Sequence, residues 1–508
     1  MNMLPTNIAD WITLGFAVLA ILGLIVFVAM YIQDVTQTSH AIRRNYPVIG
    51  RMRYRFERLG EYFRQYFFAA DREEQPFNRA ARAWVYRTAK GLGGMVGFGS
   101  TSDMHSSGSV IFVNASFPLL EEEKVDSPPL VIGANCEHPF IATSIFNISG
   151  MSFGAISKPA VRALSKGAAE AHVWLNTGEG GLSPYHEEFG PDIIFQMGTA
   201  KYGIRGSDGK LDRNLVREIG KRVKAFEIKL SQGAKPGRGG VLPGNKVTAE
   251  IAAIRGIPQG QVSSSPNRHR EIKDCDELLT MIHTIRELTG RPVGFKSVFG
   301  SEDFPRELCE AIHRRGFDYA PDFITVDGGE GGTGAAPQVL SDNVGLSLRE
   351  SLPFVVDSLN EYDLRDQIKL IASGKLVTSG DVAWALCMGA NFAVSARGFM
   401  FALGCIQSLQ CHRDTCPTGI TTHNKRFQKG LVVEDKGKRV ANYAHWVNHE
   451  INVIAHSCGL RNASEFTRDH VRIVQKPGYS VSLAKLYPEA EPNRIATESK
   501  KRIAAENG

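Results

Sequence analysis

The amino-acid sequence predicts an α/β fold, a closed (β/α)8 TIM barrel with an N-terminal transmembrane helix and helical extensions. Two patterns support the barrel. Between residues 126 and 425, short apolar runs alternate with helical segments, and each run ends in a polar or glycine-rich loop. Strands that alternate with helices form a parallel sheet, and eight such units fit a closed barrel. An open doubly wound sheet is the alternative, but no G-x-G-x-x-G follows a first strand with an acidic residue about 20 positions later.

The predicted barrel strands are apolar runs with polar ends. They begin the segments FNISGMSFGAIS (146–157), VWLNTGEGG (173–181), AFEIKLSQGAKPGRGG (225–240), QVSSSP (261–266), PVGFKSVFG (292–300), FITVDGGEGGTGAAP (323–337), IKLIASGKLVTSGD (368–381) and FAVSARGF (392–399). In such barrels the chemistry lies on the loops after the strands. We therefore expect the polar and glycine-rich ends of these segments to form the site.

The third observation is an uninterrupted apolar run over residues 11–32, WITLGFAVLAILGLIVFVAMYI. About 20 apolar residues span a bilayer as a helix. Asp10 precedes the run and Arg43 and Arg44 follow it, so the positive-inside rule places the bulk of the chain in the cytoplasm. The sequence thus predicts a single-pass membrane protein with a cytoplasmic barrel. A buried core helix is the alternative.

The chain divides into four predicted parts. These are a transmembrane anchor (1–34), a helical and loop extension (35–125), the barrel with its cysteine loop (126–425), and a helical C-terminal extension with a polar, disordered tail (426–508). Within the first extension, residues 35–95 are amphipathic and rich in arginine and aromatic residues. They form either a helical cap on the barrel or an arm on anionic lipid.

Composition excludes one class of function. The 508 residues are 43% hydrophobic and 22% charged, as in a folded protein with a large core. The net charge of +6 is modest, and no run interleaves basic residues with base-stacking aromatics. The sequence therefore predicts no nucleic-acid binding.

Three of the eight cysteines fall close together, in GCIQSLQCHRDTCPTGI. Thiolates at Cys405, Cys411 and Cys416 suit an iron–sulfur cluster or zinc. Zinc sites usually pair cysteines two to four residues apart, so the wider spacing favours a cluster. Three ligands fit a three-iron cluster, or a four-iron cluster with a non-cysteine ligand. Zinc with His412 or His423 and a chance grouping of buried cysteines are the alternatives.

Glycine-rich loops follow the last three predicted strands. Glycine lets backbone N–H groups approach a phosphate or a flavin ring closely, and the last two loops of such barrels commonly hold a phosphate. Lys296 lies within an apolar strand, where it is either a satisfied buried ion pair or a cation beside a flavin.

Together these segments resemble the central FMN-binding synthase domain of glutamate synthase. The matching motifs are SGMSFGAIS, NTGEGG, EIKLSQGAKPGRGGVLPGNKV, DGGEGGTGAAP and GCIQSLQCHRDTCPTGI, and the resemblance extends from about residue 126 to about residue 472. It implies a (β/α)8 barrel, FMN, and a [3Fe-4S] cluster on the three cysteines. The cofactor-binding residues that we expect are Ser149, Met151, Ser152, Lys296, Gly328, Gly329, Gly331, Gly332, Thr333, Gly334, Gly374, Gly380, Arg397 and Gly398.

The resemblance also implies three catalytic residues. Lys235 and Arg255 correspond to the pair that holds 2-oxoglutarate against the flavin, and Glu179 is the acidic residue of the GEGG motif. The family pattern GEGGQLPG reads GRGGVLPG here. Arg238 thus replaces a glutamate and Val241 replaces a substrate-contacting glutamine, which leaves the identity of the acidic substrate open.

These features predict a stand-alone, membrane-anchored oxidoreductase of the CH-NH2 class. It would aminate 2-oxoglutarate or a related 2-oxo acid with ammonia to give L-glutamate. One alternative is an amine or N-alkyl amino acid dehydrogenase that feeds a membrane acceptor, and another is a non-catalytic redox scaffold. The electron donor and the oligomeric state are left open.

Overall fold

The structure, a computed structural model, describes residues 7–490 and divides into two compact units, Met1–Ala80 and Ala81–Gly508. The far end of the expected polar tail, residues 491–508, lies outside the described residues.

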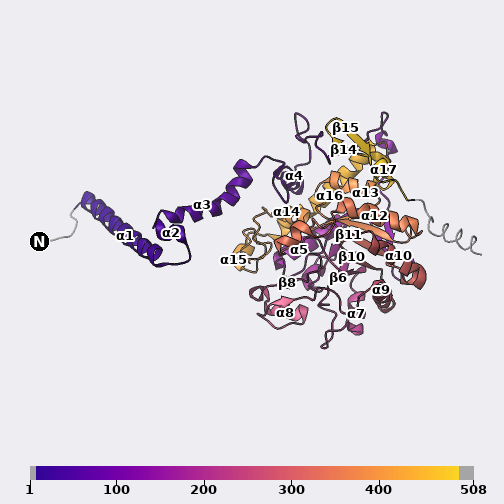
Figure 1. Cartoon of the computed structure of the whole chain (residues 1–508), viewed down its shortest axis with the longest axis horizontal. Coiled ribbons are helices and arrows are strands. Elements are labelled where there is room, and N and C mark those ends of the chain that lie inside the picture. The colour runs from indigo at the N-terminus through magenta and orange to yellow at the C-terminus, as the bar shows by residue number, and fades with distance from the viewer. Residues whose placement is uncertain (1–6, 491–508) are drawn as a thin grey trace, which may run out of the picture. The chain divides into compact units, whose positions relative to one another are not determined.

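The N-terminal unit is built from helices (Figure 1). These are α1 (Ile8–Thr36), α2 (Ala41–Asn45), α3 (Gly50–Phe63) and a π-helical turn (Arg64–Phe68). Asn7 caps α1 by accepting from the backbone N–H of Asp10. Helix α1 is long and apolar enough to cross a membrane, and its large apolar side chains are exposed.

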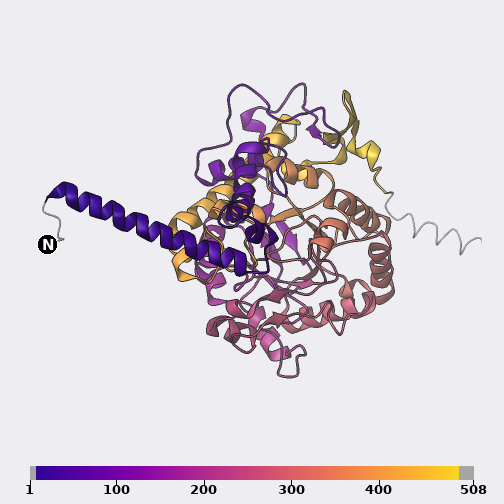
Figure 2. The same ribbon diagram turned by 60° about the vertical axis from the view of Figure 1, so that its left-hand side comes forward.

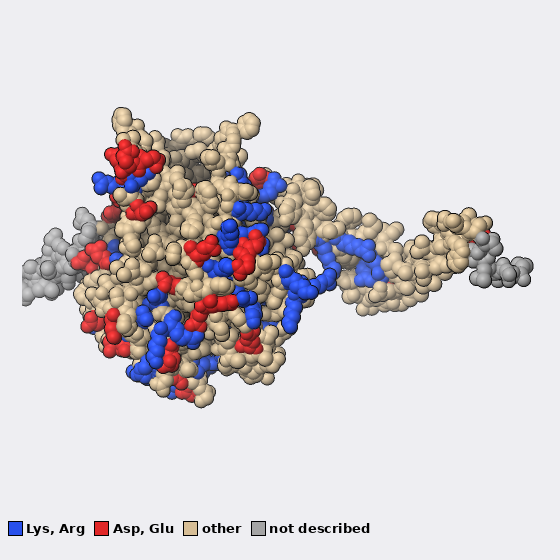
Figure 3. All heavy atoms as spheres, turned by 180° about the vertical axis from the view of Figure 1, so that it is seen from behind, with Lys and Arg blue, Asp and Glu red and all other residues tan. Residues whose placement is uncertain are grey.

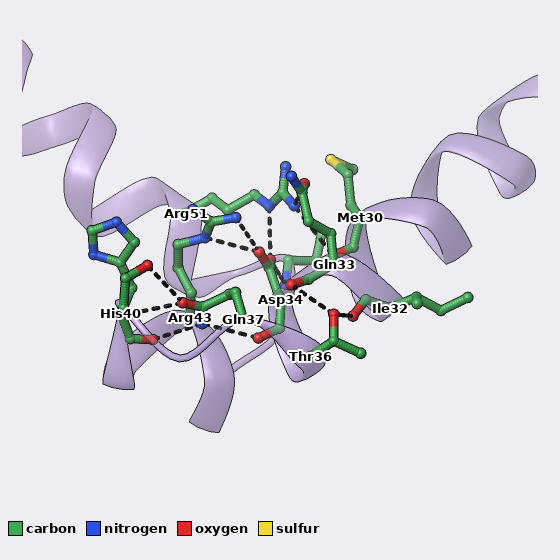
Figure 4. Close-up of polar contacts among 11 residues, drawn as sticks. Met30, Ile32, Gln33, Asp34, Thr36, Gln37, His40, Arg43 and Arg51 are labelled. Carbon is green, nitrogen blue, oxygen red and sulfur yellow. Dashed lines mark hydrogen bonds and ion pairs between the residues drawn. The ribbon is translucent and has the colours of Figure 1, made fainter.

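A fully enclosed carboxylate joins the end of α1 to the helices that follow (Figure 4). Asp34 accepts from Arg43 at 2.6 Å, from Arg51 at 2.7 Å and from the backbone N–H of Val48 at 2.9 Å. Because α1, the α2–α3 connection and α3 all contribute to this contact, the turn after α1 has a defined geometry.

The larger unit contains a closed parallel barrel of eight strands, as the sequence predicts (Figures 1 and 2). In chain order the strands are β4 (Phe146–Ile148), β5 (Leu175–Asn176), β6 (Ile193–Met197), β7 (Ala225–Lys229), β10 (Val293–Ser297), β11 (Phe323–Asp327), β12 (Lys369–Ser373) and β13 (Phe392–Ser395). Each strand pairs with the next one along the chain, and β13 closes the barrel on β4 through Val394 and Asn147.

One predicted strand is wrong. QVSSSP contributes β9 (Ser263–Ser264), which pairs antiparallel with β8 (Val241–Leu242) outside the barrel. The barrel position belongs instead to IIFQM, strand β6, in which every residue is buried. A strand buried on both faces is continuously apolar, whereas QVSSSP carries too few apolar side chains to fill such a position.

Helices follow the barrel strands. They are α5 (Lys158–Ala171), α6 (Pro184–Glu187), α7 (Arg213–Gly220), α8 (Ala249–Arg255), α9 (Cys275–Thr289), α10 (Asp303–Arg315), α11 (Gln338–Asn343), α12 (Leu348–Glu361), α13 (Ser379–Cys387), α14 (Arg397–Leu403), α15 (Lys425–Gln428) and α16 (Val433–Ser457). The remaining elements are α4 (Arg79–Ala89), β1 (Val110–Phe112), β2 (Leu130–Ile132), β3 (Phe140–Ala142), β14 (Val471–Lys476), β15 (Tyr479–Ser482) and α17 (Leu483–Leu486).

The hairpin β2–β3 packs at the amino-terminal ends of the barrel strands. Ile132 and Phe140 from the hairpin share one buried cluster with Trp174, Phe323 and Phe392. This apolar cluster closes the amino-terminal end of the barrel. A polar site can therefore form only at the opposite end, where the strands have their carboxyl ends.

Gly398 is enclosed where α14 meets α16. A Cβ at this position would lie 2.1 Å from the hydroxyl of buried Tyr443, which donates to the carbonyl of Val377. We expect Gly398→Ala to lower the free energy of unfolding by about 1–3 kcal/mol, the usual cost of overpacking. Equilibrium unfolding in denaturant measures this change in the free energy of unfolding. Gly380→Ala is the control, because its Cβ would meet only Thr378, at 4.0 Å. Equal effects of the two substitutions would contradict the packing argument.

Candidate active site

A cavity opens at the carboxyl ends of the barrel strands, with about 1060 Å³ of space including its opening to solvent. Its walls are loops that follow β4, β5, β7, β11 and β13. Ten of the sequence-predicted site residues line it: Met151, Ser152, Glu179, Lys235, Arg255, Gly332, Thr333, Gly334, Arg397 and Cys411.

The acidic centre of the cavity is Glu179, on the loop after β5. Its carboxylate lies 3.1 Å from the ammonium of Lys229, at the end of β7. Burial opposes ionisation of Glu179, but Lys229 and Lys235 outweigh burial and lower its pKa. A Cβ on Gly240 would come within 2.4 Å of this carboxylate, so the glycine leaves it room. Glu179 is therefore ionised and held in place.

Lys235 adds a second buried ammonium beside this pair. Burial lowers the pKa of Lys235, and the charge of Glu179 offsets part of that effect. One carboxylate thus faces two lysines, Lys229 and Lys235. The surplus of positive charge favours an anionic ligand in the cavity.

Arg255 ends helix α8 and is 5% exposed. One terminal nitrogen donates to the carbonyl of Phe153 at 3.0 Å, and the guanidinium lies 5.2 Å from the ring centre of Tyr202. The Nε of Arg255 has no hydrogen-bond partner among the described residues. An unpaired buried donor is costly, and a carboxylate in the cavity would satisfy it.

A single inserted segment between β7 and α9 supplies Lys235, Val241 and Arg255. Lys246, also on this segment, donates to the carbonyls of Cys411 and Thr421 at 2.9 and 2.7 Å. The insertion therefore joins the side of the cavity that carries Lys235 and Arg255 to the cysteine loop.

Lys296 forms a buried ion pair and does not line the cavity. Its ammonium lies 3.2 Å from Asp327 and 3.4 Å from the hydroxyl of Ser373. Asp327 also accepts from the backbone N–H of Gly233 at 2.9 Å. Of the two alternatives that the sequence offers for Lys296, the structure contains the ion pair.

The first part of the glycine loop after β11 bonds to the protein itself. The backbone N–H groups of Gly328, Gly329 and Gly331 donate to the carbonyls of Ser373, Leu346 and Gly328, respectively. The following residues, Gly332 to Gly334, line the cavity, and a Cβ on Gly332 would lie 2.8 Å from Arg397. Only this second part of the loop lines the cavity.

Arg397 connects this loop to the cysteines. It donates to the carbonyl of Thr333, and another of its nitrogens lies 3.9 Å from the sulfur of Cys411. Burial raises the pKa of the Cys405 thiol to about 11, and the nearby Cys411 and Cys416 raise it as well. The charge of Arg397 opposes that rise in the pKa of Cys405, so Arg397 lies near both Cys405 and Cys411.

No metal site is assembled in the described part of the chain. Within residues 7–490, no three histidine, cysteine, aspartate or glutamate side chains gather closely enough to hold a metal ion. The other predicted residues that do not line the cavity are Ser149, Gly328, Gly329, Gly331, Gly374, Gly380, Gly398, Cys405 and Cys416.

Glu227 and Gln196 belong to the site but are not among the residues that the sequence predicts for it. Buried Glu227 accepts from Asn176 at 2.9 Å, from Gln196 at 2.6 Å and from Thr325 at 2.6 Å, inside the barrel. Gln196 lies on the barrel strand that sequence reasoning missed, and it lines the cavity. A charged residue within an apolar strand, as in AFEIK, was the available signal for Glu227 and Lys229.

A closed parallel barrel with a polar cavity at the carboxyl ends of its strands defines a (β/α)8 barrel protein whose cavity lies where such barrels carry their active sites. A model of the conserved region in glutamate synthase matches residues 105–461. The chain therefore belongs to the glutamate synthase family. The family model and the names of the relatives below support an oxidoreductase of the glutamate synthase type.

Three relatives illustrate this membership. The chain is 39% identical over 504 residues to the glutamate synthase large subunit-like protein YerD of Bacillus subtilis, covering 91% of this chain and 95% of the relative. It is 34% identical over 329 residues to an archaeal glutamate synthase (NADPH) of Methanocaldococcus jannaschii, covering 64% and 61%. It is 28% identical over 415 residues to a glutamate synthase large subunit-like protein of Rhizobium meliloti, covering 77% and 90%.

Proposed function

We propose that this protein reductively aminates 2-oxoglutarate, or a related 2-oxo acid, with ammonia. The observation that carries the proposal is the convergence of Glu179, Lys235 and Arg255 on one cavity that Arg397 and Cys411 also line. The cations Lys235 and Arg255, the second with an unpaired Nε among the described residues, suit the carboxylate of an oxo acid. The glycines at 332 and 334 leave space for a planar ligand beside it.

The residues present fit FMN and an iron–sulfur cluster in their chemistry. Gly332, Thr333 and Gly334 offer a wall without bulky side chains, and Arg397 offers a cation for a phosphate or an electron-rich ring. Cys405, Cys411 and Cys416 would hold the [3Fe-4S] cluster, since thiolates are its usual ligands. When bound, FMN supplies a hydride and the cluster supplies electrons one at a time.

The side chains of the cavity then have distinct tasks. Lys235 and Arg255 bind the substrate carboxylate and fix the orientation of the neighbouring carbonyl carbon. Glu179, ionised beside its lysines, accepts a proton from ammonium, so that ammonia can attack the carbonyl carbon. It returns that proton to the carbinolamine hydroxyl, which leaves as water. Lys229 holds the Glu179 carboxylate, and the apolar walls around Val241 limit the entry of water.

We also propose that α1 anchors the enzyme in a membrane as a single span, with the barrel in the cytoplasm. The length of α1, its exposed apolar side chains and the arginines that follow it support this arrangement. The electron donor stays unassigned.

Steady-state turnover tests the reaction. Purified protein with full flavin and iron content is supplied with 2-oxoglutarate, ammonium and a low-potential donor, and L-glutamate is measured by mass spectrometry with ¹⁵N-ammonium. We expect labelled glutamate that depends on both substrates. Absence of product from the fully loaded protein would overturn the proposal.

A second candidate is the reverse chemistry on an amine or N-alkyl amino acid. Val241, exposed in the cavity wall, replaces the amide side chain of the family pattern and favours a less polar substrate at this point. Anaerobic reduction of the flavin by candidate amino acids, without NADPH, would support this alternative.

A further inference from the structure

Helix α3 and the π-helical turn after it carry a continuous apolar stripe. Met52, Phe56, Leu59, Phe63 and Phe67 are spaced by four, three, four and four residues, which places them on one helical face. All five are 43–72% exposed, and the rings of Phe63 and Phe67 lie 5.5 Å apart. The described residues of the N-terminal unit leave this face uncovered.

Arginines flank the stripe on both sides. On a helical projection, Arg55 lies along one edge and Arg53 and Arg64 along the other, while Arg58 lies further round toward the opposite face. With Arg51, residues 50–68 contain five arginines against the two glutamates Glu57 and Glu61, a net charge of +3. Figure 3 shows basic side chains on the N-terminal unit next to the uncharged surface of α1.

The contact around Asp34 places the start of this stripe at the end of α1. Arg51, in the first turn of α3, reaches Asp34 at 2.7 Å, the carbonyl of Met30 at 3.2 Å and the side chain of Gln33 at 2.6 Å (Figure 4). Figures 1 and 2 show that α3 turns away from the axis of α1 and does not continue it. If α1 spans the bilayer, α3 begins at the level where α1 leaves it.

We propose that the stripe of α3 lies in the surface of an anionic bilayer as a second membrane contact. Its apolar side chains would enter the boundary between headgroups and acyl chains, and the flanking arginines would reach the lipid phosphates. Two observations favour lipid as the partner: the stripe begins where the apolar helix α1 ends, and its borders are cationic. The inference rests on the proposed membrane span.

Photo-crosslinking of the full-length chain in nanodiscs tests the inference. A photoreactive benzoylphenylalanine replaces Phe63 on the stripe, or Glu61 on the opposite face as the matched control. The nanodiscs contain phosphatidylcholine alone or an equal mixture with phosphatidylglycerol, and mass spectrometry identifies the partner. We expect lipid adducts at position 63, several-fold fewer at position 61, and a higher yield with the anionic lipid.

Arginine substitutions in α3 and a third crosslinking site in α1 distinguish failure of the lipid contact from failure of the membrane span. Combined Arg53→Gln, Arg55→Gln and Arg58→Gln should remove the difference between the two lipid mixtures. A third site at Phe16 of α1 reports the span itself. Lipid adducts at Phe16 with protein adducts at position 63, from the barrel or a second copy, would overturn the lipid contact alone. Absence of lipid adducts at both positions would overturn the span as well.

Discussion

Replacing Arg255 with leucine should lower kcat/KM for 2-oxoglutarate by about 30- to 1000-fold, which corresponds to the roughly 2–4 kcal/mol lost when a buried charged partner is removed. Arg255 lines the cavity, is buried and has an Nε without a partner among the described residues. In the proposed function it binds the substrate carboxylate, so its loss would remove that contact. The KM for ammonium should change little, because ammonia carries no carboxylate.

Arg205 provides the control for this substitution. Its guanidinium also lies 5.2 Å from the ring centre of Tyr202, but it donates to the carbonyl of Gly256 and does not line the cavity. Arg205→Leu removes a similar stacking contact without touching the substrate. Steady-state kinetics of the two variants, with unfolding curves to show that both fold, separate the roles. Equal losses in the two variants would argue that Arg255 acts through Tyr202 and packing.

Replacing Cys411 or Cys416 with serine should reduce bound iron and acid-labile sulfide to background while leaving FMN bound. The reason is that serine keeps the size of the side chain but is a poor ligand for an iron–sulfur cluster. Turnover with a one-electron donor should be lost. Elemental analysis and the visible spectrum measure these effects independently of activity.

Cys136→Ser is the matched control, because Cys136 is a partly buried thiol that contacts Asp322, away from the cysteine loop. It should keep its iron. The described residues form no preassembled metal site, so the proposed cluster requires a local rearrangement of the cysteine loop. Iron content that is unchanged in Cys411→Ser and Cys416→Ser would remove the cluster from these positions.

Most of the barrel could be predicted from sequence, because buried parallel strands are short apolar runs that end in glycine or polar residues. Seven of the predicted runs, from FNI to FAVS, supply barrel strands. IIFQM was missed because a short apolar run cannot be assigned to a strand or a helix by periodicity alone. QVSSSP resembles a short strand followed by a turn, but its strand β9 pairs antiparallel with β8 in the insertion and not with the barrel.

The site was harder to predict because its key contacts join residues that are distant in sequence. Glu179 follows β5 and meets Lys229 two strands further around the barrel, a neighbour that only the closed sheet provides. The glycine loop was correctly placed beside the cavity, but half of its backbone donors are used within the protein. A glycine-rich loop indicates that another group comes close to its backbone. It does not indicate whether that group is a ligand or another part of the protein.

The most direct test of the central claim is a single turnover without any external donor. The FMN-loaded protein is reduced anaerobically, mixed with 2-oxoglutarate and ammonium, and the return of oxidised flavin absorbance is followed together with L-glutamate. The proposed site predicts one glutamate per flavin, only when both substrates are present, and a much slower reaction in Arg255→Leu. Flavin that stays reduced with both substrates, or that is instead reduced by an amino acid in the oxidised protein, would contradict it.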